Sequence, residues 1–406
     1  MTDDSGLIFS GLKVLDVGTW IAGPVSATIL ADFGASVIKV ESPGLGDPFR
    51  ALAGGPLSPN SDVNYCWITD GRNKRSITLN LKTPEARHIL IRLVKECDVY
   101  VTNQPFPTRE KLGLRYEDLA PLNERMIYAS LTAYGEEGPD AQLEGFDGVA
   151  WWARTGLMDM VRAPGATPGM SVPGMGDHPT AVTMYAAIVT ALMRRERTGK
   201  GGKVHTSLLA NGLWANACLG QAALVEAEFP VRDDGSAPPR SPNRVLFETA
   251  DKRLLQLYMV RTQEELDGLF VAAGRLDMLS DPRFMNLESR MANAAPLIAE
   301  LKATFRQKTA KEWMAIFRAE GVPVTLVAEM QDLLHDEQLY ANRMVVPPTG
   351  PGVPAKVVIN HPINIDGLAT VGPRHAPEVG EHTAEVLAEM GFSEAEIAGF
   401  AERGVT

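Results

Sequence analysis

The sequence is poor in cysteine and histidine, on which many metal and redox sites depend. Three of its 406 residues are cysteines and seven are histidines, with no Cys-x-x-Cys and no His-x-x-x-His spacing among them. A disulfide framework, a thiol redox centre and a zinc site therefore find no support, and we predict no metal. This cysteine usage is typical of a reducing compartment, so we expect a cytoplasmic protein.

Positive charge and long hydrophobic runs are also scarce. Lys and Arg (39) are outnumbered by Asp and Glu (50), for a net charge of −11, so the chain lacks the basic excess that neutralises phosphates and we expect no nucleic-acid partner. The longest apolar stretch, residues 181–193, is interrupted by Thr and Tyr and is shorter than the ~20 residues of a membrane span. We therefore expect no membrane-spanning segment. Because the first residues are acidic, we also expect no signal peptide.

Several nucleophile and nucleotide motifs are missing. The sequence has no Gly-x-Ser-x-Gly elbow, and the glycines within residues 199–202 lack the spacing of a phosphate-binding loop. The segment Gly18–Gly23 follows a predicted strand but lacks the middle glycine that lets a backbone approach a pyrophosphate. Serine-hydrolase, P-loop and nicotinamide- or flavin-dependent chemistry are therefore not predicted, although a Rossmann-like scaffold is.

The hydrophobic pattern of the first half predicts strands that alternate with helices. Such alternation implies a parallel sheet that helices cover on both faces, so we predict an α/β fold with a Rossmann-like large domain. The predicted strands are 13–17, 37–41, 98–102, 126–131 and 203–207, and the predicted helices are 25–33, 84–96, 180–197 and 208–226.

A change of composition predicts a second domain. Residues 229–243 contain four prolines and mixed charges, as is typical of a linker. A strand-like run at 254–258 and a mainly helical pattern over 264–317 follow. We predict a smaller α+β domain over residues 229–329 and a large domain formed by residues 1–228 and 330–406.

Two segments are candidates for chemistry. Gly174–His178 places Asp177 in a glycine-rich loop directly before the long predicted helix. Such an Asp is often only a helix cap, but it is also where a carboxylate could attack an activated acyl group, because a helix amino terminus favours the anionic form. Gly71–Ser76 contains three cations, which predict either a solvated turn or a phosphate site.

A series of short motifs extends along nearly the whole chain. They are Gly11–Asp16 with Ala22–Pro24, Asp32–Ala35 with Ile38–Glu41, Asn73–Ser76, Tyr134–Gly135 with Gly138–Pro139, Gly176–Asp177, Asp281–Phe284, Gly321–Pro323, and Ala376–Pro377 with Gly380–Thr383. In this order they resemble the family III CoA-transferases, whose relatives include formyl-CoA, carnitine and 2-hydroxyacyl CoA-transferases.

The resemblance implies an enzyme that moves CoA from an acyl-CoA to a carboxylic acid. Asp177 would be the nucleophile and would pass through an aspartyl-acyl anhydride and an aspartyl-CoA thioester. The same resemblance implies an interlocked homodimer, with no permanently bound cofactor and with coenzyme A only as part of the substrate. The residues that it implies for CoA contacts are Asn73, Lys74, Arg75, Asn103 and Lys111.

Some positions depart from the formyl-CoA branch of this family. Ile21 stands where that branch has Gln, and residues 242–247 have no glycine-rich lid, so a formyl or oxalate substrate is not expected. The segment Trp151–Arg154 is similar to relatives that handle larger 2-hydroxy or aryl acids, and its aromatic pair would suit a bulkier acyl group.

Other positions leave alternatives. The fold also hosts 2-methylacyl-CoA racemases, in which Asp177 would match the acid, but Phe146 replaces the partner histidine and cannot carry a proton. Asp147 matches an acid of the transferase pocket, with a purely structural role as the alternative, and Asp159 is interpreted as an ordinary acid. A racemase-like enzyme and a non-catalytic CoA-binding subunit remain the alternatives to a transferase.

Overall fold

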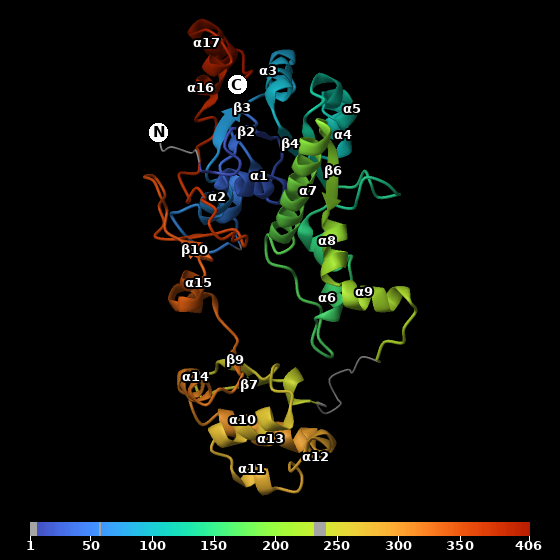
Figure 1. Ribbon diagram of the computed structural model, residues 1–406, viewed down its shortest axis with the longest axis vertical. Coiled ribbons are helices and arrows are strands. Elements are labelled where there is room, and N and C mark those ends of the chain that lie inside the picture. The colour runs from blue at the N-terminus through green and yellow to red at the C-terminus, as the bar shows by residue number, and fades with distance from the viewer. Residues whose placement is uncertain (1–5, 57, 231–240) are drawn as a thin grey trace. The chain divides into compact units, whose positions relative to one another are not determined.

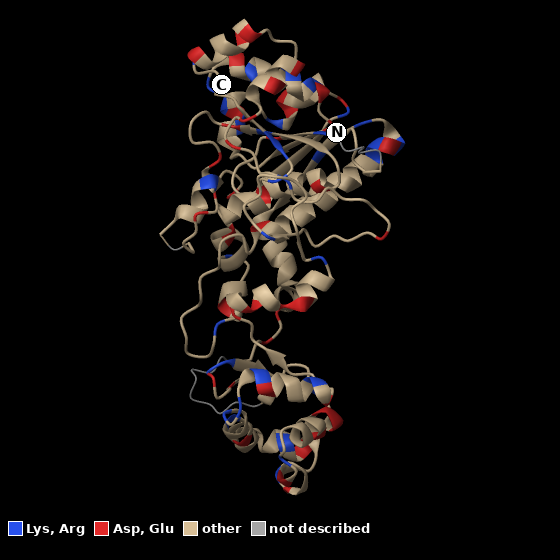
Figure 2. Cartoon of the chain, turned by 90° about the vertical axis from the view of Figure 1, so that its left-hand side faces the viewer, with Lys and Arg blue, Asp and Glu red and all other residues tan. Residues whose placement is uncertain are grey.

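The computed structural model describes residues 6–56, 58–230 and 241–406, and it divides into two compact units (Figure 1). The larger unit comprises residues 1–162, 167–229 and 338–406, and the smaller one residues 163–166 and 230–337. Most of the predicted linker at 229–243 lies outside the described residues. Basic and acidic residues occur in both units (Figure 2), and neither unit carries charge of one sign only.

A six-stranded, fully parallel sheet forms the centre of the larger unit, which confirms the predicted α/β class. Its strand order is β3-β2-β1-β4-β5-β6, so the order reverses direction between β1 and β4. Crevices at such reversal points, outside the carboxyl ends of the strands, are where open α/β sheets bind ligands. The strands are β1 Lys13–Asp16, β2 Ser36–Glu41, β3 Arg75–Thr78, β4 Val99–Thr102, β5 Ile127–Thr132 and β6 Gly202–Ser207.

Alternate residues of these strands pack into two cores, one on each face of the sheet. In β4, Val99 and Val101 join the core that includes residues of α1 (Ala22–Asp32) and α7 (Asp177–Thr198). Tyr100 between them joins the opposite core, with residues of α3 (Pro84–Glu96) and α16 (Thr383–Glu389). The strands are buried on both faces because helices cover both, as the alternation of strands with helices predicted.

The helix boundaries differ from the prediction at two places that matter for the site. Helix α7 begins at Asp177 rather than at residue 180, so this Asp is the first residue of the helix. The predicted helix over 208–226 is two helices, α8 (Leu208–Ala215) and α9 (Ala217–Leu224), because the backbone leaves the helical path at Asn216. The Asn216 side chain donates a 2.9 Å hydrogen bond to the Thr155 carbonyl.

The smaller unit has its own core and a three-stranded antiparallel sheet in the order β7-β8-β9. Its strands are β7 Leu246–Glu248, β8 Leu254–Gln256 and β9 Thr325–Leu326, and its helices are α10 Gln263–Ala272, α11 Asp277–Ser280, α12 Leu287–Ala292, α13 Ala294–Phe305 and α14 Ala310–Ala319.

Short elements complete the larger unit. They are α2 Tyr65–Asp70, α4 Phe106–Leu112, α5 Tyr116–Leu119, α6 Leu157–Met160, α17 Glu394–Glu402, and the pair β10 Val345–Val346 and β11 Val358–Ile359, with α15 Glu337–Ala341 where the chain passes from the smaller unit to the larger one. No helix of the described chain is both long and apolar enough to cross a lipid bilayer.

Candidate active site

The loop after β1 and the loop after β4 face each other at the reversal point of the sheet. Asn103 joins them, because its side-chain oxygen accepts from the Thr19 amide at 2.8 Å and its side-chain nitrogen donates to the Thr19 carbonyl at 2.7 Å. Trp20, the next residue, has a φ of 63°, which is strained for a bulky side chain. The Trp20 amide donates to Asp47 at 2.9 Å, which helps to hold this conformation.

A group of buried charges supports the loop after β1. The Lys39 ammonium lies 2.7 Å from Asp47 and 3.7 Å from Asp16, and it donates to the Gly18 carbonyl. Lys74 reaches Asp16 at 2.9 Å from the other side. Buried ions are tolerated only when paired in this way, and these pairs help to fix the crevice. Sequence reasoning missed this group, because its members meet only through the fold.

The loop before α7 is held by one short contact and one carboxylate. A Cβ atom at Gly176 would lie 2.5 Å from Cγ of Trp151, so only glycine fits here. The Gly176 amide donates to Asp147 at 2.9 Å, which gives the buried Asp147 a clear role in positioning the loop. Together these contacts place Asp177 at the first turn of α7, where the helix dipole favours a negative charge.

The Asp177 carboxylate is poorly compensated. Burial raises the pKa of Asp177 to about 7, and the nearby Asp147 carboxylate adds to the rise, whereas His178 opposes it. No described residue donates a hydrogen bond to the Asp177 side chain, which leaves its oxygens available to a ligand. A partly buried carboxylate whose pKa lies near neutrality is typical of a group that reacts rather than one that only supports the fold.

His178 contacts the same loop from the other side. Its Nε2 lies 3.2 Å from the Asp70 carboxylate and its Nδ1 lies 3.0 Å from the Gly174 carbonyl. Burial lowers the pKa of His178, but the hydrogen bond and charge of Asp70 outweigh this and raise the pKa to about 9. The ring therefore carries a proton at neutral pH and provides a positive charge next to Asp177.

Two hollows adjoin these residues. The first, which we call the switch-point hollow, has a volume of about 300 Å³ and lies at the reversal point, or switch point, of the strand order. Its lining includes Thr19, Trp20, Asn103, Phe106, Phe146 and Asp177. The apolar cavity, of about 730 Å³, is lined mainly by Ile21, Val25, Ile29, Phe49, Leu52 and Val182, with His178 at its wall.

The two hollows share a boundary made of consecutive residues. Trp20 lines the switch-point hollow and Ile21 lines the apolar cavity, and the same division separates Asp177 from His178. Asp177 and His178 are therefore the step from the polar hollow to the larger, apolar one.

The structure separates the residues predicted to contact CoA into two groups. Asn103 lines the switch-point hollow, and Lys111 is exposed on α4, which begins at Phe106 in the wall of that hollow. Asn73, Lys74 and Arg75 instead lie where β3 begins; β3 is the outermost strand of the sheet, and Arg75 pairs with Ile38 of β2.

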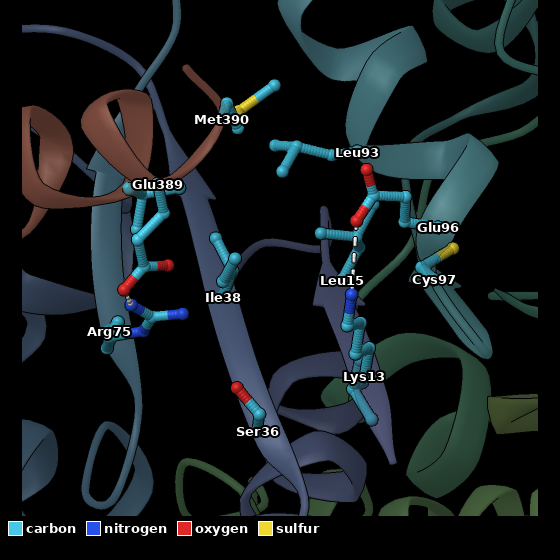
Figure 3. A pocket seen from close by; sticks show the side chains of 12 residues that line it. Lys13, Leu15, Ser36, Ile38, Arg75, Leu93, Glu96, Cys97, Glu389 and Met390 are labelled. Carbon is cyan, nitrogen blue, oxygen red and sulfur yellow. Dashed lines mark hydrogen bonds and ion pairs between the residues drawn. The ribbon is translucent and has the colours of Figure 1, made fainter. Parts of the chain in front are cut away.

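The side chains of this second group are occupied by other partners. Asn73 donates to Asp32 at 2.7 Å, and the Lys74 ammonium is buried against Asp16. Arg75 lies 2.7 Å from Glu389 and 2.9 Å from Glu385, and Figure 3 shows Arg75 directed toward Glu389 beside Ile38 and Ser36. All three residues also line a separate hollow of about 520 Å³, and their contact with CoA stays a prediction.

The tryptophan pair also differs from expectation. Trp151 and Trp152 are each 8% exposed and stack on each other behind the Gly176 loop, and they line neither hollow. Trp151 supports the loop at Gly176, and a contact of the pair with an acyl group stays a prediction. Phe146, by contrast, is exposed, meets Trp20 edge to face at 5.3 Å, and lines the same hollow as Asp177.

Comparisons with known proteins agree with this arrangement. Residues 9–383 match the model of CoA-transferase family III. The chain is 33% identical to the cinnamoyl-CoA:phenyllactate CoA-transferase of Clostridium sporogenes over 96% of its length and 95% of that protein, and 31% identical to the (R)-2-hydroxy-4-methylpentanoate CoA-transferase of Clostridioides difficile over 98% and 99%. Among solved structures, it resembles a CAIB/BAIF family protein from Brucella suis, with a TM-score of 0.82 and 29% identity over 94% of this chain and 99% of that one.

Proposed function

Because the chain belongs to CoA-transferase family III, we propose that it transfers coenzyme A from an acyl-CoA thioester to a carboxylic acid, with Asp177 as the nucleophile. The observation that carries this proposal is the Asp177 carboxylate itself. It lines an open hollow at the reversal point of the sheet, it has a pKa near neutrality, and it has no hydrogen-bond donor from the described residues.

The reaction divides into two matched halves. The Asp177 carboxylate attacks the thioester carbon, the C–S bond breaks, and CoA leaves as a thiolate from an aspartyl-acyl anhydride. The thiolate then attacks the aspartyl carbonyl, which releases the donor acid and leaves an aspartyl-CoA thioester. The acceptor carboxylate repeats these steps in reverse order, so that acceptor acyl-CoA departs and the Asp177 carboxylate is restored.

The switch-point hollow is the proposed site of the CoA arm. It opens where parallel sheets with this strand order bind nucleotide-containing ligands. Lys111 is exposed on α4 and provides a charge for a phosphate, while Asn103 shapes the floor through the Thr19 backbone. Asn73, Lys74 and Arg75 line a different hollow and stay predicted CoA contacts.

One observation favours a transferase over a racemase. A racemase of this fold needs a second proton carrier, and the position expected for it holds Phe146, which faces the same hollow as Asp177. Phenylalanine cannot donate or accept a proton, so α-proton exchange would lack its partner group.

We also propose that the enzyme is an interlocked homodimer in the cytoplasm. Helices α8 and α9 and the residue after them expose large apolar side chains: Trp214 is 81% exposed, Leu224 73% and Val225 65%. Such a patch is typical of a surface that another chain covers. The three cysteines are unpaired, as expected in a reducing compartment. Light scattering of the purified protein tests the dimer, and a monomer at micromolar concentration would contradict it.

The test of the reaction is CoA exchange followed by mass spectrometry. Wild-type protein with acyl-CoA and hydroxylamine should form a hydroxamate at Asp177, and Asp177→Asn should abolish both this adduct and the exchange. The matched control is Asp159→Asn, at an acid of α6 that pairs with Arg162, and this variant should keep both the adduct and the exchange. Proton exchange at the α-carbon in deuterated water without CoA transfer would favour the racemase instead.

A further inference from the structure

The apolar cavity suggests which acids the enzyme handles. Its volume of about 730 Å³ lies within the range of small-molecule sites, which span about 300–1,000 Å³. Its wall comes from α1, from the 3-10 segment Pro48–Gly54, from α2, from the first turns of α7 and from residues 359–362, which start at the end of β11. These elements belong to one compact unit, so the cavity exists without any contribution from the smaller one.

The charged residues in the wall of this cavity are already paired. Asp70 contacts His178 at 3.2 Å, so each compensates the other. The Arg72 guanidinium lies 2.7 Å from Asp32, and it also donates to the Thr69 carbonyl. An incoming carboxylate would therefore have to compete with an internal anion for either cation. Burying a second carboxylate there without a partner is strongly unfavourable.

The cavity lies directly behind the proposed nucleophile. Ile21 belongs to its wall and approaches the Gly174 segment, since a Cβ atom at Gly174 would lie 3.5 Å from Ile21 Cδ1. Asp177 and Trp20, the neighbours of His178 and Ile21, face the switch-point hollow. A thioester at Asp177 whose CoA arm fills the polar hollow has this apolar space on its other side.

From this arrangement we infer that the apolar cavity receives the side chain of the transferred acyl group, and that the substrates are monocarboxylic acids with an aromatic or branched aliphatic side chain. The inference rests on the proposed CoA transfer and specifies the class of acids that this reaction uses. Dicarboxylic acids are excluded, because their second carboxylate finds no unpaired cation in the wall. Ile21, Leu52 and Val182 set the size limit.

Identity exchange tests this inference without knowledge of the natural donor and acceptor. Each acyl-CoA is incubated with its own deuterated acid, and label in the thioester is measured for 3-phenylpropanoate, 4-methylpentanoate, butanoate, succinate and glutarate. We expect kcat/KM for the first two to exceed that for the dicarboxylates by at least about 100-fold. Equal or faster exchange with succinate or glutarate would overturn the inference.

A cavity-filling variant locates the side chain. Val182→Phe narrows the cavity, so we expect exchange of 3-phenylpropanoate to fall at least about 10-fold while butanoate exchange changes little. The matched control, Val161→Phe, adds the same bulk at a valine that is 62% exposed and outside the cavity, and it should change neither rate. An equal loss for both acids in Val182→Phe, or the same selectivity in the control, would contradict the assignment.

Failure of the reaction and failure of the inference remain distinguishable. Absence of exchange with every acid would refute the proposed transfer. Equilibrium binding would then test whether the apolar cavity receives the acyl side chain. Wild-type protein should bind the unreactive thioether S-(3-phenylpropyl)-CoA at least about 10-fold more tightly than S-(3-carboxypropyl)-CoA, and Val182→Phe should remove this preference. Equal affinity for the two thioethers would overturn the inference.

Discussion

Replacement of Asp177 by asparagine should make the protein more stable at neutral pH. The pKa of this carboxyl rises from 3.8 to about 7 on folding, mainly because of burial and the nearby Asp147. The unfolded chain therefore ionises more easily than the folded protein, and the charge opposes folding. Asparagine has nearly the same shape and no charge, so it removes this penalty.

The size and pH range of the effect follow from linkage. Each pH unit between the two pKa values corresponds to about 1.4 kcal/mol, so the upper bound is about 4 kcal/mol. Asp177 is partly exposed and solvent screens its charge, which reduces the expected gain to about 1–2 kcal/mol. Below about pH 4 the carboxyl is protonated in both states and the gain vanishes; it grows between pH 4 and 7 and is complete above about pH 7.

Thermal unfolding at several pH values measures this prediction. At pH 8 the midpoint of Asp177→Asn should exceed that of wild type by about 1–3 °C, and at pH 4 the two should coincide. Asp159→Asn, at an acid whose side chain is 59% exposed, controls for removal of a surface charge. A variant that unfolds at or below the wild-type temperature at pH 8, or a gain that does not depend on pH, would refute the burial of a charge at this position.

Three other predictions concern catalysis and the crevice. The kcat/KM of CoA exchange should rise with pH to a plateau with a midpoint near 7, because only the ionised Asp177 attacks a thioester; a flat profile between pH 5 and 9 would contradict this. Gly176→Ala should lower exchange at least about 10-fold by displacing the loop, whereas Gly169→Ala, where a Cβ meets nothing within 4 Å, should not. Lys74→Met should destabilise the protein by about 3–5 kcal/mol in denaturant unfolding, since it leaves a buried carboxylate short of a partner, while Lys13→Met at an exposed pair should cost under about 1 kcal/mol.

Local periodicity was enough to predict the elements of the larger unit. The helix predicted over 84–96 matches α3 at both ends, because Thr83 caps it and Pro84 can occupy only a first turn. The start of α7 was predicted three residues late, since Gly174 and Gly176 indicate a loop and only the packing against Trp151 shows why Gly176 is needed at the helix entrance. Elements follow from local pattern, but their exact ends depend on contacts.

The site was less accessible to sequence reasoning. Asp177 could be found because a glycine-rich loop precedes a long helix, but its partners Asp147 and Asp70 lie 30 and 107 residues earlier in the chain. The apolar cavity could not be found at all, because its lining comes from elements that meet only after α1 packs against α7. These side chains share no local sequence pattern, and they come together as a site only because the strand order brings their elements side by side.

In the mechanism that we propose, the placement of Asp177 between two unlike hollows lets a single residue serve both halves of the exchange. The thiolate would leave and return without escape if the CoA arm stays bound in the polar crevice. The donor acid would leave and the acceptor would enter through a second space that holds its ligand only by apolar contact. Asp177 and His178 form the step between these spaces, so the backbone of one helix turn keeps the nucleophile in reach of both.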